Sequence, residues 1–161
     1  MQSLIEYPVR IVIIALTFLA VLGLALLNIN TSQMQPYNDY VQAQVINSNG
    51  LTGAVLVDAQ KMAKTAFRNS GTYKIINPKT NQPFPWYVDE TGQPIQNAVT
   101  KANEALVTAG YGQVRYGTRV TFTVTATYPI PIVSYITRSS SKSITFDRKI
   151  SAVVNSYAKE P

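Results

Sequence analysis

The sequence predicts an α+β protein in which a long N-terminal apolar helix carries a small C-terminal domain with two helices and an antiparallel β-sheet. Three patterns lead to this prediction. The run Ile11–Leu27 is apolar and uncharged. Residues 51–70 and 94–109 repeat apolar side chains with helical spacing, and residues 119–128 and 143–157 alternate as half-buried strands do.

The apolar run is expected to be a membrane anchor. At about 1.5 Å per residue, a helix from Leu4 to Leu27 matches a hydrocarbon core of about 30 Å. A cleaved signal peptide is a poorer interpretation, because Arg10 is the only base before the run and no small-residue cleavage site follows it. Small side chains suited to helix–helix contacts occur at Ala15, Ala20, Gly23 and Ala25.

Glu6 is the acidic residue at the start of this helix, and two interpretations remain open. An ionised carboxylate in an apolar segment is costly unless it is paired. Arg10 lies one turn further along, in the favourable acid-before-base order, so the two can form an intrahelical pair. Alternatively, Glu6 meets a positive group on another copy of the chain.

The segment after the anchor reads as the upper part of a stalk. Pro36 is expected to interrupt the helix, and apolar residues at Tyr37, Val41 and Val45 allow further helical turns beyond it. Asn47 to Gly50 should end the stalk. We therefore assign residues 1–50 to a transmembrane and stalk helix, and residues 51–161 to a globular head domain.

Both predicted head helices have one apolar face. In residues 51–70 the apolar positions run from Leu51 to Phe67, and Gly71 is placed to end the helix. In residues 94–109, Pro94 suits the first helical position and Gly110 the end.

Between these helices, residues 71–92 predict a hairpin of two short strands, YKII and FPWYV. Its aromatic side chains could form a surface for stacking, or pack in the core or a subunit interface. Asp89 and Glu90 are adjacent carboxylates, for which a turn is the expected role, since no third ligand for a metal is nearby.

The last two strands bracket a loop. Residues 119–128 alternate apolar side chains with threonine, and residues 143–157 continue this alternation except at Arg148, which is expected to pair with Asp147 or to lie at a bulge. In the segment that joins these two strands, Pro129 and Pro131 exclude a further central strand.

The composition argues against an enzyme. The chain has no histidine or cysteine, and its eight acidic residues are scattered. No nucleophile motif or phosphate-binding glycine loop is present, so we expect no catalytic residues, no cofactor and no metal. Two classes remain: a filament-forming subunit, and a single-copy membrane-anchored accessory protein. The net charge of +6 lies entirely beyond residue 30.

Several stretches together resemble a known family. The segment SLIEYPV, the alanine-rich residues 54–66, and the C-terminal TFTVTATYPIPIV and SITFDRKISAVVNSYAKE are similar to TadE/TadG-like pilin-related proteins of the type IV pilin superfamily, from tight-adherence (Flp) pilus systems. In that family a prepilin peptidase trims a leader, and a glutamate near the new N-terminus pairs with a neighbouring amine during assembly. The resemblance implies this role for Glu6, with Met1 at or near the processed end. Arg10 remains the competing intrahelical partner of Glu6. The family's glutamate is usually the fifth mature residue and here it is the sixth from Met1, so the processed start is Gln2 or the spacing is looser.

The resemblance also implies a place and partners. The subunit would sit in the cell membrane with its head outside, and then in an extracellular surface filament made of copies of itself or related pilins, built by the pilus assembly machinery. A minor pilin or pseudopilin of a pilus or secretion apparatus is the alternative.

DNA or an acidic cell-surface polymer could bind the basic head, for which the expected contact residues are Phe84, Trp86, Tyr87, Arg138 and Lys142.

Overall fold

The α+β fold predicted from the sequence is confirmed. The computed structural model describes residues 2–32, 34–69, 71–129 and 143–155. In chain order its elements are α1 (Gln2–Ser32), α2 (Met34–Asn47), α3 (Gly53–Lys64), β1 (Thr72–Asn77), β2 (Gln82–Pro83), α4 (Ala98–Ala109), β3 (Arg119–Pro129) and β4 (Ser143–Val153). The strands form one antiparallel sheet in the order β2-β1-β3-β4.

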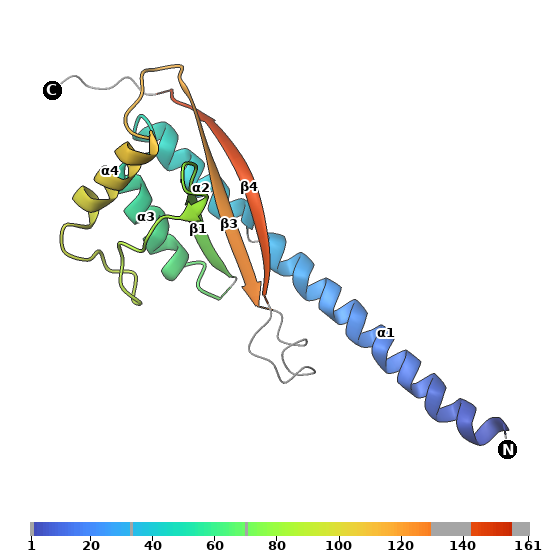
Figure 1. Cartoon of the computed structure of the whole chain (residues 1–161). Coiled ribbons are helices and arrows are strands. Elements are labelled where there is room, and N and C mark those ends of the chain that lie inside the picture. Colours follow the sequence, from blue (N-terminus) through green and yellow to red (C-terminus); the bar gives the residue numbers. More distant parts are fainter. Residues whose placement is uncertain (1, 33, 70, 130–142, 156–161) are drawn as a thin grey trace.

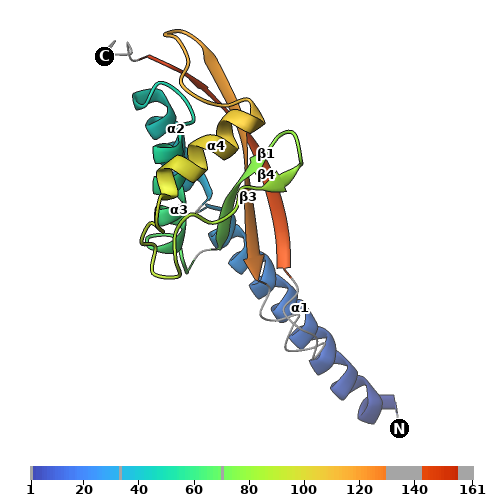
Figure 2. The same ribbon diagram turned by 60° about the vertical axis from the view of Figure 1, so that its left-hand side comes forward.

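The head has two layers, with α2, α3 and α4 on one side of the sheet (Figures 1 and 2). The helix α1 extends from this head as a long rod and carries the N-terminus at its far end (Figure 1). Strand β3 shows why one layer of helices is enough to cover the apolar side of the sheet. Its apolar residues from Val120 to Tyr128 are buried at every second position, and the threonines between them lie on the opposite face of the sheet.

The helix α2 belongs to the head core, although the sequence assigns residues 34–47 to the stalk. Its buried side chains include Tyr37, Val41 and Val45, all in the same hydrophobic cluster as β3. Pro36 lies in the first turn of α2, where a missing N–H costs no helical hydrogen bond. The rod that leaves the head is therefore α1 alone.

The aromatic core joins the helices to the sheet. The ring of Tyr37 on α2 stacks on Tyr73 of β1 at 4.6 Å, and Tyr73 meets Tyr128 of β3 edge-on at 6.2 Å. The Tyr37 hydroxyl donates to the carbonyl of Ala59 on α3 at 3.2 Å. One side chain of α2 thus contacts both a neighbouring helix and the sheet.

Both head helices are shorter than predicted. The helix α3 ends at Lys64 rather than near residue 70, and the Thr65 hydroxyl donates back to the Lys61 carbonyl at the last turn. The helix α4 starts at Ala98, because Asn97 adopts a left-handed conformation that breaks the helical path. Pro94, predicted as the first helical residue, instead forms an isolated bridge with Val88.

The hairpin after β1 is also shorter than predicted. Its second strand, β2, contains only Gln82 and Pro83, because Pro83 and Pro85 have no N–H to continue a ladder. Strand β4 pairs with β3 in continuous register past Arg148, so no bulge is present there. Arg148 donates to Gln35 of α2, while Asp147 accepts from Thr125, so Arg148 and Asp147 are not partners.

The contact between α3 and α4 depends on Gly53. A Cβ atom at this position would lie 2.4 Å from the Val99 carbonyl oxygen and 2.7 Å from the Asn103 nitrogen, both backbone atoms of α4. Gly53→Ala should therefore force the helices apart and destabilise the head by about 2–3 kcal/mol. Thermal unfolding followed by near-UV circular dichroism measures this. Gly23→Ala is the matched control, since nothing lies within 4 Å of a Cβ there; equal unfolding midpoints for the two variants would contradict the close approach.

The Tyr40 hydroxyl of α2 donates to Asp58 of α3. Burial, and then this bond to a carboxylate, raise the pKa of Tyr40 from 10.0 to about 12. Because the folded pKa is the higher one, the protonated phenol contributes stability that is complete below pH 10 and is lost as the pH rises towards 12.

Tyr40→Phe should lower the free energy of unfolding at pH 7 by about 1–2 kcal/mol. Its stability should also fall less steeply than that of the unmodified protein between pH 10 and 12. Denaturant titrations at several pH values measure both effects. Tyr7→Phe on the exposed helix α1 is the control and should change neither. A Tyr40→Phe curve parallel to the unmodified one would show that the bond does not couple α2 to α3.

Candidate functional site

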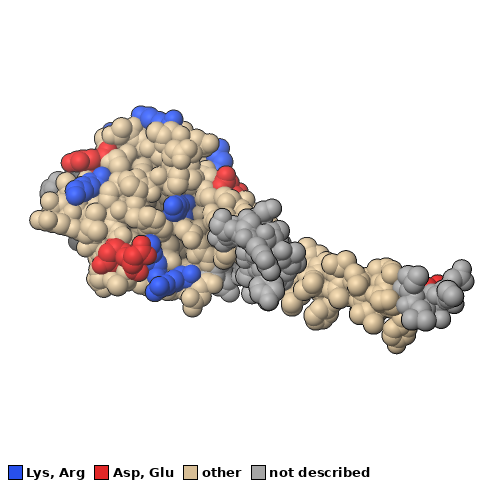
Figure 3. All heavy atoms as spheres, turned by 60° about the horizontal axis from the view of Figure 1, so that its bottom comes forward, with Lys and Arg blue, Asp and Glu red and all other residues tan. Residues whose placement is uncertain are grey.

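Between Glu6 and Ala25 the helix α1 has apolar side chains on all sides, and none of these residues is buried in the molecule. The stretch Glu6–Ala25 has a mean hydropathy of 2.3 and is long and apolar enough to cross a membrane, a test that a signal sequence near an N-terminus also passes. Leu24, Phe18 and Ile14 are each about two-thirds exposed. The sequence has no charged residue between Arg10 and the start of the head, and the face of the rod seen in Figure 3 is correspondingly uncharged where it is described. Such a surface requires lipid or protein to cover it.

Near the far end of α1, Glu6 and Arg10 face each other one turn apart. Arg10 Nη2 lies 3.7 Å from Glu6 Oε2. The side chain of Glu6 is 65% exposed and that of Arg10 is 74% exposed. At this distance the pair is an ion pair without a good hydrogen bond. The carboxylate is therefore accessible to a second cation. Met1 lies outside the described residues, so its position relative to Glu6 is not defined.

The small residues of α1 lie on more than one side of the helix. At about 100° per residue, Ala20 and Gly23 are roughly 60° apart and share a face, Ala25 lies roughly opposite them, and Ala15 lies between Gly23 and Ala25, roughly 80° from each. All but the partly exposed Gly23 are exposed. Thr17 lies beside Ala20 and donates its hydroxyl to the Ile13 carbonyl at 2.8 Å, which satisfies a polar group in an otherwise apolar stretch.

The predicted aromatic contact surface is wrong for two of its three aromatic residues. Phe84 is 3% exposed and Tyr87 is 6% exposed, so both belong to the core. Gln60 of α3 holds this irregular segment inward: its side-chain nitrogen donates to the Pro85 carbonyl, and its oxygen accepts from the Tyr87 N–H, both at 2.7 Å. Only Trp86 remains partly exposed. Arg138 and Lys142 lie outside the described residues.

Asp89 has the turn role that its sequence predicts. Its carboxylate accepts from the backbone N–H groups of Thr91 and Gln93 at 2.8 and 2.9 Å, and from the Thr91 hydroxyl at 2.7 Å. These hydrogen bonds, led by the one from the Thr91 hydroxyl, lower the pKa of Asp89. The neighbouring Glu90 points instead to Lys64 of α3, with 2.9 Å between nitrogen and oxygen. Within the described part of the chain, no three acidic residues gather as metal ligands.

Comparisons of this chain with family models, with curated proteins and with solved structures find no match.

Because the described core residues include those of α2 and none from the described side chains of α1, the head should fold without the rod. We expect deletion of residues 1–32 to give a soluble, folded monomer, since it removes exposed apolar side chains and no described core residue. Deletion of residues 1–47 should unfold the head, because it also removes Tyr37, Val41 and Val45, each worth a few kcal/mol. Circular dichroism and size-exclusion chromatography compare the two. An unfolded first variant would mean that the core needs α1 or neighbouring copies.

Proposed function

We propose that this chain is a structural, pilin-like subunit that assembles through α1 into an extracellular filament of the type IV or Tad-like kind, serving adhesion, surface attachment or DNA transfer. The observation that carries the proposal is the helix α1: it leaves a folded head, is apolar on every side and has a carboxylate near its free end. Before assembly the same helix would hold the subunit in the cell membrane with the head outside.

The exposed surface of α1 favours a bundle. Burial of apolar surface stabilises by about 25 cal/mol per Å². A lipid bilayer buries the apolar surface of α1 while the subunit is single. Neighbouring α1 helices bury the same surface once the subunit leaves the membrane. A soluble head alone needs no such rod, since the core already contains the buried residues of α2, α3 and the sheet.

The placement of the small residues supports contacts on more than one side. Ala20 and Gly23 allow close approach of one neighbour, and Ala25 allows another on roughly the opposite side, with Ala15 between the two positions. A dimer would use one such face. A helical polymer needs at least two, because each subunit contacts different neighbours on different sides.

Glu6 supplies a reason for ordered assembly. Inside an apolar bundle an isolated carboxylate is costly, and the ion pair with Arg10 at 3.7 Å satisfies it only in part. A terminal amine of the adjacent subunit would provide a closer partner and would fix the axial offset between neighbours. This is the role that the family resemblance implies for Glu6.

The alternative is a single-copy accessory protein, a minor pilin or pseudopilin anchored by α1. Electron microscopy of sheared surface material, with antibody labelling of the head, separates the two. Filaments labelled along their whole length would support the role of structural subunit. Label confined to membranes would support the role of accessory protein.

Glu6→Ala tests the pairing role directly. Membrane insertion should be unchanged or improved, because removing a charge favours the apolar phase. The amount of polymer in the sheared fraction should fall at least tenfold, as expected for loss of about 1.4 kcal/mol or more per contact. Quantitative immunoblots of membrane and sheared fractions measure both.

Arg10→Ala is the matched control on the same helix. If Glu6 pairs with the neighbouring subunit, Arg10→Ala leaves assembly near normal. If the intrahelical pair is what matters, both substitutions reduce assembly alike. Normal polymer yield from Glu6→Ala would reject the pairing role.

A further inference from the structure

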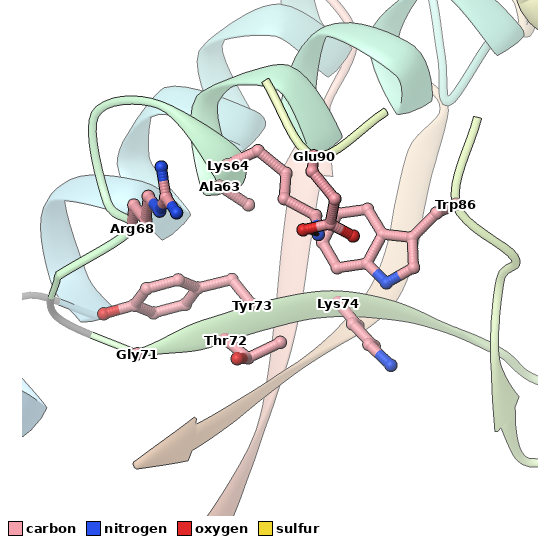
Figure 4. A pocket seen from close by; sticks show the side chains of 9 residues that line it. All are labelled: Ala63, Lys64, Arg68, Gly71, Thr72, Tyr73, Lys74, Trp86 and Glu90. Carbon is pink, nitrogen blue, oxygen red and sulfur yellow. Dashed lines mark hydrogen bonds and ion pairs between the residues drawn. The ribbon is translucent and has the colours of Figure 1, made fainter. Parts of the chain in front are cut away.

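A hollow of about 220 Å³ opens on the head between the end of α3 and strand β1. Figure 4 shows its arrangement: Arg68 lies on one side, the indole of Trp86 on the other, and Lys64 and Glu90 between them, above β1. The hollow is smaller than the pockets of about 300–1,000 Å³ that hold drug-sized ligands, so it suits a single small unit.

Positive charge exceeds negative charge at this hollow. Lys64, Arg68 and Lys74 line it together with one acid, Glu90. Lys64 pairs with Glu90 at 2.9 Å, but Arg68 and Lys74 have no ion-pair partner among the described residues. The hollow therefore carries a net positive charge, with Arg68 and Lys74 at different ends of it, and an anionic ligand would stabilise this arrangement.

The aromatic wall of the hollow is Trp86. The ammonium of Lys64 lies 4.7 Å from the centre of its ring, and that of Lys74 lies 5.7 Å away. Both cations are therefore held next to an apolar, half-buried surface. A ligand that fits must combine a negative charge with an apolar face.

The Glu90 carboxylate pairs with Lys64, as the negative group of such a ligand would. Its side chain is 90% exposed, whereas that of Lys64 is only 20% exposed. An ion pair with one exposed partner contributes little to stability, so an external carboxylate can displace Glu90 at low cost. A ligand carboxylate that displaces Glu90 would lie next to Lys64, on the side of the hollow that faces Arg68.

We propose that this hollow binds one carboxylated sugar unit of an acidic polysaccharide. The guanidinium of Arg68 can take a planar carboxylate in bidentate fashion, and the indole can pack against the C–H face of a sugar ring. Nucleic acid fits less well, because a phosphate backbone needs a line of cations and the hollow is one unit long. The proposal does not depend on whether α1 assembles.

The test uses the full chain in detergent micelles and a galacturonic-acid trisaccharide as the probe. Trp86 is the single tryptophan of the sequence, so intrinsic fluorescence reports on the hollow itself. We expect a saturable fluorescence change with the trisaccharide. The fully methyl-esterified trisaccharide, which keeps the rings but lacks the charges, should bind at least tenfold more weakly.

Variants separate a built site from general attraction. Arg68→Ala and Lys74→Ala should each weaken binding about tenfold, as loss of a charge-assisted contact does. Lys61→Ala removes the same charge from an exposed position of α3 that does not line the hollow, and should change affinity less than about twofold. Glu90→Gln should strengthen binding, since the competing carboxylate is gone. Circular dichroism confirms that each variant is folded.

Several results would overturn the proposal. Equal weakening by Lys61→Ala would mean non-specific attraction to a basic head. Equal affinity for the methyl ester would remove the role of the charge. Tighter binding of a single-stranded DNA oligomer, lost in the same variants, would assign the hollow to phosphate. Absence of any saturable change with the trisaccharide would leave the hollow without the proposed ligand.

Discussion

The stack of Tyr37 on Tyr73 is the contact on which the shape of the molecule depends. It joins α2 to the sheet at 4.6 Å, and the hydroxyl of Tyr37 joins α2 to α3. Burial raises the pKa of Tyr37 well above its usual value, so the ring stays neutral in the core. Because α1 precedes α2 directly in the chain, the orientation of α2 on the sheet also determines where the apolar rod leaves the head (Figure 1).

The two ends of the molecule consequently have different chemistry. The rod is apolar and has a single acid–base pair at its far end, whereas the head carries the excess of positive charge. A protein of this kind can bury one part in an apolar environment and present the other part to solvent. The hollow beside Trp86 lies on the head, so it stays accessible whichever environment covers α1.

How far the sequence predicts the structure depends on whether a residue's position follows from periodicity. The alternation in β3 identifies every buried residue of that strand, because period two leaves no choice of face. Phe84 and Tyr87 could not be placed this way. Their burial depends on Gln60, a distant side chain that satisfies the backbone of an irregular segment. The core role of α2 does not follow from periodicity either: the apolar stripe Tyr37, Val41 and Val45 predicts a helix, but does not show that this helix packs on the sheet and is no part of the stalk. The hollow combines α3, β1 and a loop, so no single stretch encodes it.

The contacts of α2 with β4 affect more than the packing of the head. Among the described residues β4 is an edge strand of the sheet. An exposed edge strand is a template for unwanted pairing with other chains. Gln42 donates to the Ser151 carbonyl of this strand at 3.2 Å, and Arg148, on the side of the sheet that faces the helices, is held by Gln35. A side chain on an edge carbonyl and a charge turned inward both discourage strand addition. Copies of this chain crowded side by side would therefore be protected from amyloid-like association of their sheets.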